Sequence, residues 1–340
     1  MERGPSARPV DPIGAKAAGA KKPPVVGRFA PTPSGRMHLG NVFSCLMAWL
    51  SAKSGGGRVV LRIEDLDPRA QDPAVADRLM ADLDWLGLGW DEGPYFQSDR
   101  TELYEEAVGR LGALGLTYPC FCTRAELHAA TAPHASDGTY LYAGTCRGLT
   151  AEQIAQKSLR RAPATRLRVP EAGDPAGAIE FCDLAFGPQK EVLASECGDF
   201  LVRRSDGVFA YQLAVVVDDG LMGVNQVVRG RDLLSSSARQ TYLARLLGIE
   251  HPAYGHVPLL TAPGGRRLSK RDQDLDLGAL RDRGVPAGRI IGSLAAAAGI
   301  ADPGEEATPT ELIERFSWDK IAEHRGDIVV DGDFLSRLVG

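Results

Sequence analysis

The segment from Arg28 to Asn41 constrains the fold more than any other part of this 340-residue chain. It follows the short apolar run Val25-Val26 and precedes a stretch, 42–50, in which apolar residues recur at helical spacing. Two prolines and two glycines lie within it, so the order predicts a strand, a tight loop and a helix. The first N–H groups of a helix lack backbone partners and attract phosphate, and His38, at the predicted helix start, can donate one more hydrogen bond.

The chain around this segment alternates between strand-like and helix-like patterns. Apolar runs predict strands at 25–29, 58–63, 208–217 and 226–229. Asp72 is placed to cap a helix that begins at Pro73 and ends near Gly87. Ser98 is placed to cap the next helix, with a stop near Gly115. Alternating strands and helices favour a parallel α/β sheet.

A middle segment breaks this alternation. From about 116 to 196 the chain has paired cysteines, a loop rich in small and polar residues at 129–144, and a half-buried strand pattern at 165–169. We interpret it as an insertion that splits the sheet, and the chain becomes helical after Asp274. The predicted division is a flexible tail at 1–24, the first half of the sheet domain at 25–115, the insertion at 116–196, the second half at 197–262 and a loop with a helical C-terminal region at 263–340.

Composition limits the possible classes of protein. An apolar content of 44% is ordinary for a globular enzyme, and a net charge of −5 means that any contact with nucleic acid has to come from a local basic surface. No run of about 18 apolar residues predicts a membrane-spanning helix. The first 24 residues lack the apolar stretch of a secretory signal. Six cysteines in a chain of this length indicate metal binding or free thiols, and we expect a cytoplasmic protein.

A second signal lies far downstream, where Lys270 is flanked by arginines in the segment 266–271. Together the two signals resemble the signatures of the class I aminoacyl-tRNA synthetases: His38-Leu39-Gly40-Asn41 resembles the HIGH signature and 267–271 resembles the KMSKS signature. The segments 28–35 and 61–67 resemble the glutamyl branch. Taken singly, an ordinary strand–helix turn and an exposed basic loop stay open as alternatives.

The resemblance implies an α/β fold: a Rossmann-like parallel sheet, split by a zinc-bearing insertion and followed by a short helical C-terminal region. It also implies two sets of site residues. Those for ATP are His38, Gly40, Asn41 and Lys270, with His38 and Lys270 as the catalytic pair. Those for L-glutamate are Arg28, Phe29, Ala30, Pro31, Thr32, Glu64, Tyr211 and Arg229.

The residue types fit these roles. Arginine captures a carboxylate through two N–H groups, and an acid such as Glu64 suits an α-ammonium. Arg229 by itself also fits a surface arginine, and Tyr211 a packed strand residue. The chain departs from the family pattern at Asn41, where a second histidine is usual, and at Arg267, where a lysine is usual.

The insertion contains a candidate metal site. Cys120, Cys122, Tyr142 and Cys146 offer three thiolates and one phenolate, which can close a tetrahedral structural zinc site, although free thiols in a strand are an alternative. This order of ligands resembles one subgroup, the glutamyl-Q tRNA(Asp) synthetases. We expect the other cysteines to be buried apolar residues, and two histidines of the insertion to be exposed in a loop, with the histidines open as alternative metal ligands. These are Cys45, Cys182, Cys197, His128 and His134.

Two basic groups are candidates for RNA contact, with a solvated face as the alternative for the first. The first comprises Lys157, Arg160, Arg161, Arg166 and Arg168, and the second Arg266, Arg267, Lys270 and Arg271. About 70 residues follow Lys270, which is short for the helical domains that read an anticodon. The chain therefore resembles the catalytic body of a glutamyl-tRNA synthetase without that part.

The resemblance implies that L-glutamate is activated with ATP and magnesium and then transferred to queuosine in the anticodon of tRNA(Asp). We expect a monomer with no membrane partner. Three other functions stay open: a shortened synthetase that charges a tRNA 3′ end, a small-molecule adenylating ligase, and an inactive relative that only binds RNA. Intact His38 and Lys270 argue against the last.

Overall fold

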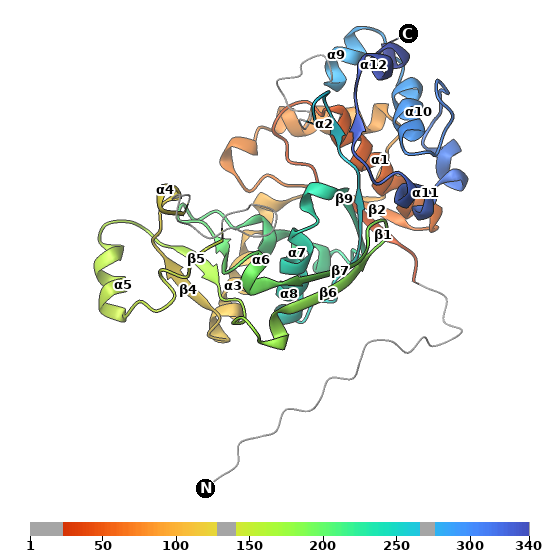
Figure 1. The fold of residues 1–340 in the computed structure, drawn as a ribbon. Coiled ribbons are helices and arrows are strands. Elements are labelled where there is room, and N and C mark those ends of the chain that lie inside the picture. The colour runs from red at the N-terminus through yellow and green to blue at the C-terminus, as the bar shows by residue number, and fades with distance from the viewer. Residues whose placement is uncertain (1–22, 128–140, 266–275, 340) are drawn as a thin grey trace.

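The computed structural model describes residues 23–127, 141–265 and 276–339, and Figure 1 shows its elements. The strands are β1 (Val26–Phe29), β2 (Arg58–Ile63), β3 (Glu92–Phe96), β4 (Thr117–Cys120), β5 (Ala164–Leu167), β6 (Ala178–Asp183), β7 (Gly187–Val192), β8 (Phe200–Arg203), β9 (Gln226–Gly230), β10 (Ala253–Val257), β11 (Leu260–Thr261) and β12 (Ile328–Val329). The helices are α1 (Leu39–Ser54), α2 (Pro73–Trp85), α3 (Thr101–Ala113), α4 (Arg124–Leu127), α5 (Ala151–Ser158), α6 (Leu193–Glu196), α7 (Tyr211–Leu221), α8 (Ser236–Leu247), α9 (Leu277–Asp282), α10 (Ala287–Ala297), α11 (Trp318–Glu323) and α12 (Gly332–Val339).

Parallel strands from two distant parts of the chain form the centre of the molecule. β1, β2 and β3 pair in parallel in that order, and β9 pairs in parallel with β10. β9 lies beside β1, where the backbone N–H of Val26 donates to the side chain of Asn225. α1 packs across β1 and β9, and its buried face, which includes Phe43, Leu46 and Leu50, belongs to the largest apolar core. The sheet is therefore split in sequence and joined in space, as the fold class predicted.

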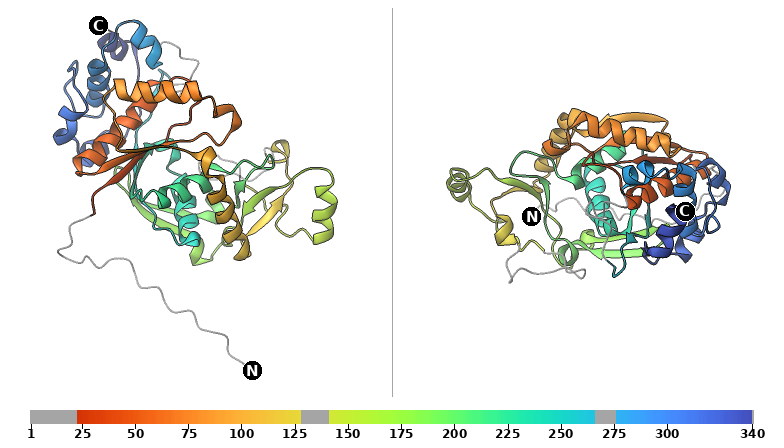
Figure 2. Two further views of the ribbon diagram at one scale, coloured as in Figure 1. Left: turned by 180° about the vertical axis from the view of Figure 1, so that it is seen from behind. Right: turned by 90° about the horizontal axis from the view of Figure 1, so that it is seen from above.

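The insertion forms its own small sheet. β4, β5 and β8 pair antiparallel, and α5 projects from this sheet away from the parallel strands (Figure 2). The third strand, β8, comes from residues 200–203, beyond the boundary drawn at 196. The β6–β7 hairpin takes a different path: it leaves this sheet and packs against β10 and α8, so that one arm of the insertion returns to the parallel strands.

The C-terminal region is helical apart from one short strand. Its helices α9 to α12 share the largest core with α1, and the indole N–H of Trp318 donates to the Ser51 hydroxyl of α1 at 3.0 Å. β12 pairs in parallel with β11 and ties this region to the end of the second half of the sheet. Within the described ranges no helix combines the length and apolarity needed to cross a bilayer.

Two sequence-based predictions of local structure were wrong. The run 208–217 was expected to be a strand, but most of it belongs to helix α7, whose residues from Leu213 to Asp219 are all buried. A continuous apolar run does not distinguish a buried helix from a strand, and here burial on all sides removes the helical period. Ser98 does not cap α3: it lies in a 3₁₀ turn and its hydroxyl donates to Asp65 at 2.6 Å.

The other helix boundary was predicted correctly. Asp72 caps α2 by accepting the N–H of Ala74, Pro73 is the first helical residue, and Gly87 follows the end of the helix with a φ of 74°. A positive φ disfavours any residue with a Cβ, so glycine suits this stop.

Candidate active site

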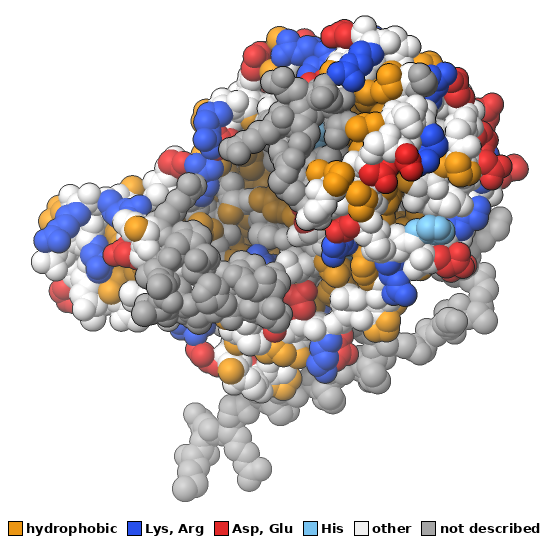
Figure 3. Space-filling model, turned by 45° about the horizontal axis from the view of Figure 1, so that its top comes forward, with side chains coloured by type: hydrophobic (Ala, Val, Ile, Leu, Met, Phe, Trp, Pro, Cys, Tyr) orange, Lys and Arg blue, Asp and Glu red, His pale blue; other side chains and the backbone are white. Residues whose placement is uncertain are grey.

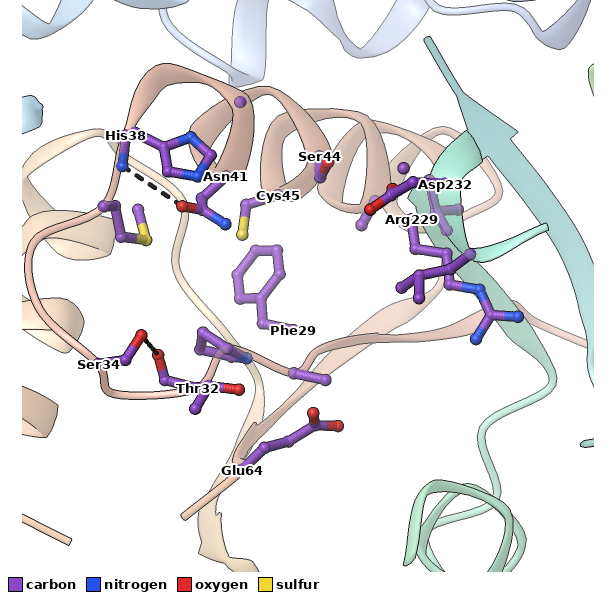
Figure 4. A pocket seen from close by; sticks show the side chains of 18 of the residues that line it. Phe29, Thr32, Ser34, His38, Asn41, Ser44, Cys45, Glu64, Arg229 and Asp232 are labelled. Carbon is purple, nitrogen blue, oxygen red and sulfur yellow. Dashed lines mark hydrogen bonds between the residues drawn. The ribbon is translucent and has the colours of Figure 1, made fainter. Parts of the chain in front are cut away.

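A cavity of about 680 Å³ opens between the loop after β1, the start of α1 and the ends of β2 and β9. This volume is in the range of small-molecule sites. The predicted residues that line it are Arg28, Phe29, Ala30, Pro31, Thr32, His38, Gly40, Asn41, Glu64, Tyr211 and Arg229. In Figure 4 His38 and Asn41 lie at one end of the cavity, at the start of α1, while Glu64 and Arg229 lie at the other end. The structure thus brings the predicted ATP and glutamate residues of the described segments to one cavity.

The helix start at His38 has the local geometry expected of a phosphate site. His38 is the N-cap of α1 with an extended backbone, and its N–H donates to the side chain of Asn41. α1 carries no acid in its first turn, so its positive end is not neutralised locally. A Cβ on Gly40 would lie 3.1 Å from two atoms of the His38 ring, so the imidazole lies directly over Gly40. The Asn41 side chain closes the turn by accepting the backbone N–H of His38 at 3.4 Å.

Buried charges hold the opposite side of the cavity. Arg62 is fully buried and binds Asp219 at 2.6 Å, and its guanidinium also lies 3.4 Å from Glu64. Arg28 is buried beside the same Asp219 and donates to the carbonyl of Val228 at 3.0 Å. Burial lowers the pKa of Arg28, and Asp219 acts in the opposite direction. The buried Arg62–Asp219 ion pair therefore supports the side chains of Arg28 and Glu64 and fixes their positions.

Glu64 combines burial with partial access to the cavity. Its side chain is 11% exposed. Burial raises the pKa of this carboxyl above its ordinary value, while Arg62 and Arg28 act in the opposite direction. A carboxylate that is poorly solvated gains more from a cationic ligand than an exposed one does, because less water has to be displaced. Glu64 is thus suited to an ammonium group.

Arg229 is buried and held from several directions. Its Nη2 donates to Ser237 at 2.8 Å, and its Nη1 donates to Gln240 at 2.9 Å and to the hydroxyl of Tyr211 at 3.4 Å. Its Nε donates to His256 at 3.1 Å. Arg229 is therefore not a surface arginine, and Tyr211 is the first residue of α7 rather than a strand residue.

Lys270 and the rest of 266–271 lie outside the described residues. The chain that follows them is placed, and it lies beside the first signature: Asp276 pairs with His38, and the N–H of Leu277 donates to the carbonyl of Met37 at 2.9 Å. Asp276 is six residues beyond Lys270 in sequence. This pairing places the chain that follows the second signature beside the start of α1.

The predicted ligand set of the insertion converges on one point. The thiols of Cys120, Cys122 and Cys146 lie within 4.8 Å of one another, the only such group among the described residues. The sulfurs of Cys122 and Cys146 are 3.7 Å apart, and the hydroxyl of Tyr142 lies 3.6 Å from the sulfur of Cys120 and 3.9 Å from that of Cys122. With zinc–sulfur bonds of about 2.3 Å, the ligands of a tetrahedral zinc lie roughly 3.5 to 3.8 Å apart. The three measured distances therefore match the edges of such a site.

The surroundings of the cluster act differently on its cysteines, and Arg166 favours a thiolate at Cys120. The buried guanidinium of Arg166 donates to the sulfur of Cys120 at 3.3 Å and lies 3.7 Å from the centre of the Tyr142 ring. Burial and the neighbouring Cys120 raise the pKa of Cys122 to about 12 in the metal-free chain, so a metal bound there has to displace a proton. Because the Arg166 guanidinium contacts both Cys120 and Tyr142, it offsets part of the negative charge of three thiolates and a phenolate.

The other predictions for the insertion had mixed outcomes. Arg166 is buried at the cluster, so the first basic group is not one surface, whereas Lys157, Arg160 and Arg161 are exposed on the projecting end that α5 forms. Figure 3 shows Lys and Arg side chains gathered at this end. Cys182, expected to be buried, is exposed, because it lies on the outer face of the hairpin. Cys45 and Cys197 are half-buried, and His128 and His134 lie outside the described residues.

Several cavity and supporting residues were not predicted. Ser44, Cys45 and Asp232 also line the cavity, and burial raises the pKa of Cys45 to about 12, so it is a neutral thiol. Spacing along α1 would have found the first two, since they follow Asn41 by three and four residues on one helix face. Apart from Tyr211, the partners of Arg229 come from α8 and β10, and no local pattern marks them.

Comparisons with known proteins place the chain among enzymes that use tRNA. A family model described as tRNA synthetases class I (E and Q), catalytic domain, matches residues 24–323. The chain is 48% identical to a glutamyl-Q tRNA(Asp) synthetase of Nitratidesulfovibrio vulgaris, covering 92% of this chain and 97% of that protein. It is 48% identical to a second one, of Symbiobacterium thermophilum, covering 92% of this chain and 98% of that protein.

A solved structure shares the fold. It is a glutamate tRNA ligase of Elizabethkingia meningosepticum in complex with its amino acid, with a TM-score of 0.75 and 26% sequence identity. The match covers 92% of this chain and 68% of that chain, so it includes the insertion and the helical C-terminal region as well as the parallel strands.

Proposed function

Because the chain belongs to the glutamyl-Q tRNA(Asp) synthetases, a branch of the class I tRNA synthetases, we propose that it activates L-glutamate with ATP and transfers the glutamyl group to queuosine in the anticodon of tRNA(Asp). The observation that supports this most is the single cavity. A helix start with no acid in its first turn lies at one end, and two buried arginines and a carboxylate lie at the other. That arrangement fits a triphosphate and a dicarboxylic amino acid side by side.

We propose that the residues opposite α1 bind glutamate. Arg28 and Arg229 take its two carboxylates, because a guanidinium offers paired N–H donors to a carboxylate. Glu64 binds the α-ammonium, and the hydroxyl of Tyr211 adds a donor beside Arg229. The residues Phe29 to Thr32 form part of the wall. The two carboxylates distinguish glutamate from glutamine, whose amide would present an N–H to one of the arginines.

We propose that the start of α1 binds ATP. The N-terminal N–H groups of α1 and the imidazole of His38 face the phosphates, with Gly40 leaving room for the ring and Asn41 fixing the turn. We propose that Lys270 also contacts these phosphates as a point charge. Magnesium accompanies ATP as part of the substrate.

The reaction takes place in two steps. An oxygen of the α-carboxylate of glutamate attacks the α-phosphorus of ATP, the bond to the bridging oxygen breaks, and pyrophosphate leaves. Charge stabilisation and alignment lower this barrier more than proton transfer does, since no proton moves in the step. A hydroxyl oxygen of queuosine then attacks the carbonyl carbon of the glutamyl-adenylate. AMP leaves with its electron pair, the hydroxyl proton is released, and an ester remains.

We propose that Cys120, Cys122, Tyr142 and Cys146 hold a structural zinc ion. Four protein ligands fill a tetrahedral zinc completely and leave no position for a substrate, so the ion stabilises the fold of the insertion. The cluster joins β4 to the segment before α5. The exposed basic residues of the projecting end, Lys157, Arg160 and Arg161, then contact RNA phosphates.

Two assays test this function. Pyrophosphate exchange into ATP should depend on L-glutamate and not on L-glutamine or L-aspartate. Labelled glutamate should pass to queuosine-containing tRNA(Asp) and not to the same tRNA without queuosine. Nuclease digestion and mass analysis of the labelled tRNA should locate the label in the anticodon fragment. Label at the 3′ end would instead indicate a charging synthetase, and label on a small amine or thiol an adenylating ligase.

A further inference from the structure

A buried hydrogen-bonded chain connects Arg229 to the inserted hairpin. The Nε2 atom of His256 on β10 lies 3.1 Å from the Nε of Arg229. Its Nδ1 atom lies 2.6 Å from the Oδ2 atom of Asp183, the last residue of β6. The side chains of Asp183 and His256 are both 0% exposed. Neither residue lines the cavity, so any effect of the pair on a ligand has to pass through Arg229.

The backbone fixes the orientation of the Asp183 carboxylate. Its Oδ1 atom accepts the N–H groups of Ala185 at 3.0 Å, Phe186 at 2.9 Å and His256 at 3.3 Å. The other oxygen, Oδ2, faces the imidazole. Although burial acts against ionisation, these hydrogen bonds hold the pKa of Asp183 below its ordinary value. Asp183 is therefore an ionised acceptor with one oxygen committed to the backbone and the other to His256.

This arrangement selects one tautomer of His256. Burial lowers the pKa of the ring below its ordinary value, with the charge of Arg229 acting in the same direction and Asp183 in the opposite one, so the imidazole is neutral at pH 7. An ionised carboxylate only accepts, so Nδ1 carries the proton and donates to Asp183. Nε2 is then a lone pair that accepts the N–H of Arg229. The backbone of Leu233 also forms a hydrogen bond with the ring, so a tautomer with the proton on Nε2 would have an acceptor as well. An NMR measurement of the two ring nitrogens distinguishes these tautomers.

We propose that Asp183 and His256 are positioning residues for Arg229, which fix its guanidinium with the Nη1 edge beside Tyr211 turned toward the cavity to receive a carboxylate of glutamate. Nε, Nη2 and one N–H of Nη1 are committed to His256, Ser237 and Gln240, so the second N–H of Nη1, with its long contact to Tyr211, is the donor that a ligand can use. The inference rests on the proposed function for the identity of the ligand. It also gives the β6–β7 hairpin a role in amino-acid binding, although the hairpin belongs to the insertion.

The variant Asp183→Asn tests the tautomer with a minimal change of shape. The three backbone N–H groups require an oxygen at the Oδ1 position, so the amide NH₂ has to face His256. The ring then accepts at Nδ1 and carries its proton on Nε2, where it opposes the N–H of Arg229. We expect the KM for glutamate in pyrophosphate exchange to rise about 10- to 100-fold, the value of one hydrogen bond to a charged group, with the KM for ATP within twofold.

A matched control lies on the same hairpin. Glu180 is 67% exposed and pairs with Lys190, so Glu180→Gln makes the same chemical change without touching His256, and both KM values should stay at wild type. Nitrogen-15 NMR of histidine-labelled protein reads the tautomer, with the signal of His256 assigned by its loss in His256→Gln. A protonated Nδ1 in the wild type and a protonated Nε2 in Asp183→Asn support the proposal.

Either of two results would overturn the inference: a wild-type ring protonated on Nε2, or an Asp183→Asn variant with an unchanged KM for glutamate. The wild-type NMR result needs no variant to fold. If the wild-type enzyme shows no glutamate-dependent exchange, the proposed function fails instead, and the tautomer measurement still decides whether the pair orients Arg229.

Discussion

The substitution Gly40→Ala tests whether the position of the His38 ring controls activation. The new Cβ would lie 3.1 Å from both Cε1 and Nδ1 of His38, whereas unstrained contacts between such atoms are about 3.5 to 4.0 Å. The ring therefore has to recede by roughly half an ångström. A displacement of about 1 Å at a reacting centre costs on the order of 100-fold in rate, so half of it should cost about tenfold.

Although Gly40→Ala should lower kcat, we expect it to leave the free energy of unfolding unchanged or to raise it slightly. Gly40 is the second residue of α1, and alanine is favoured over glycine in a helix by up to about 1 kcal/mol, which offsets the strain of the contact. The control is Gly109→Ala in α3, where a Cβ meets no atom within 4 Å. It should raise the thermal midpoint slightly and leave activity unchanged. The assay is kcat for pyrophosphate exchange at saturating ATP and glutamate, with thermal unfolding in parallel. Wild-type kcat in Gly40→Ala would refute the assigned position of His38.

Three further predictions address other parts of the molecule. Burial raises the pKa of Glu64, so this side chain should be protonated at a pH where an ordinary glutamate is still ionised, and the KM for glutamate should rise there. Glu64→Gln should remove this pH dependence. A variant with the wild-type pH profile would count against the role of Glu64. Cys146→Ser should lose bound zinc, and retention of one equivalent by elemental analysis would contradict the site. Alanine at all three exposed basic positions of the projecting end should weaken tRNA binding and reduce the slope of log K against log salt concentration by about 0.9 per lost phosphate contact. Pyrophosphate exchange should stay unchanged, and an equal loss of exchange would point to misfolding instead. These positions are Lys157, Arg160 and Arg161.

The sequence predicted the parts of the site that local pattern specifies. The loop from Arg28 to Asn41 contains the strand, the turn and the helix start in one segment, so its residues had to share one end of the fold. The convergence of Cys120, Cys122, Tyr142 and Cys146 was also predicted, from their spacing and from the resemblance to a subgroup with the same order of ligands. The start of α2 was predicted correctly because the capping residue Asp72 and the first helical residue Pro73 both act within one turn.

The parts that were missed depend on contacts between distant segments. The apolar run at 208–217 is buried on every side in α7, and nothing in its own residues shows that Asp218 and Asp219 bind Arg62 from β2. Arg166 alternates with apolar residues as a surface residue would, yet it lies over Tyr142 in the interior. Asp183 and His256 are 73 residues apart and meet only because the hairpin returns to β10. Pairings of this kind are set by topology.

The most direct test of the account is a crystal structure with a non-hydrolysable analogue of glutamyl-adenylate. We predict that the side-chain carboxylate and the α-ammonium of the analogue lie among Arg28, Arg229 and Glu64, and that the phosphate mimic lies at the start of α1 beside His38. An analogue bound in the reverse orientation, or outside this cavity, would contradict the claim that one cavity holds both substrates.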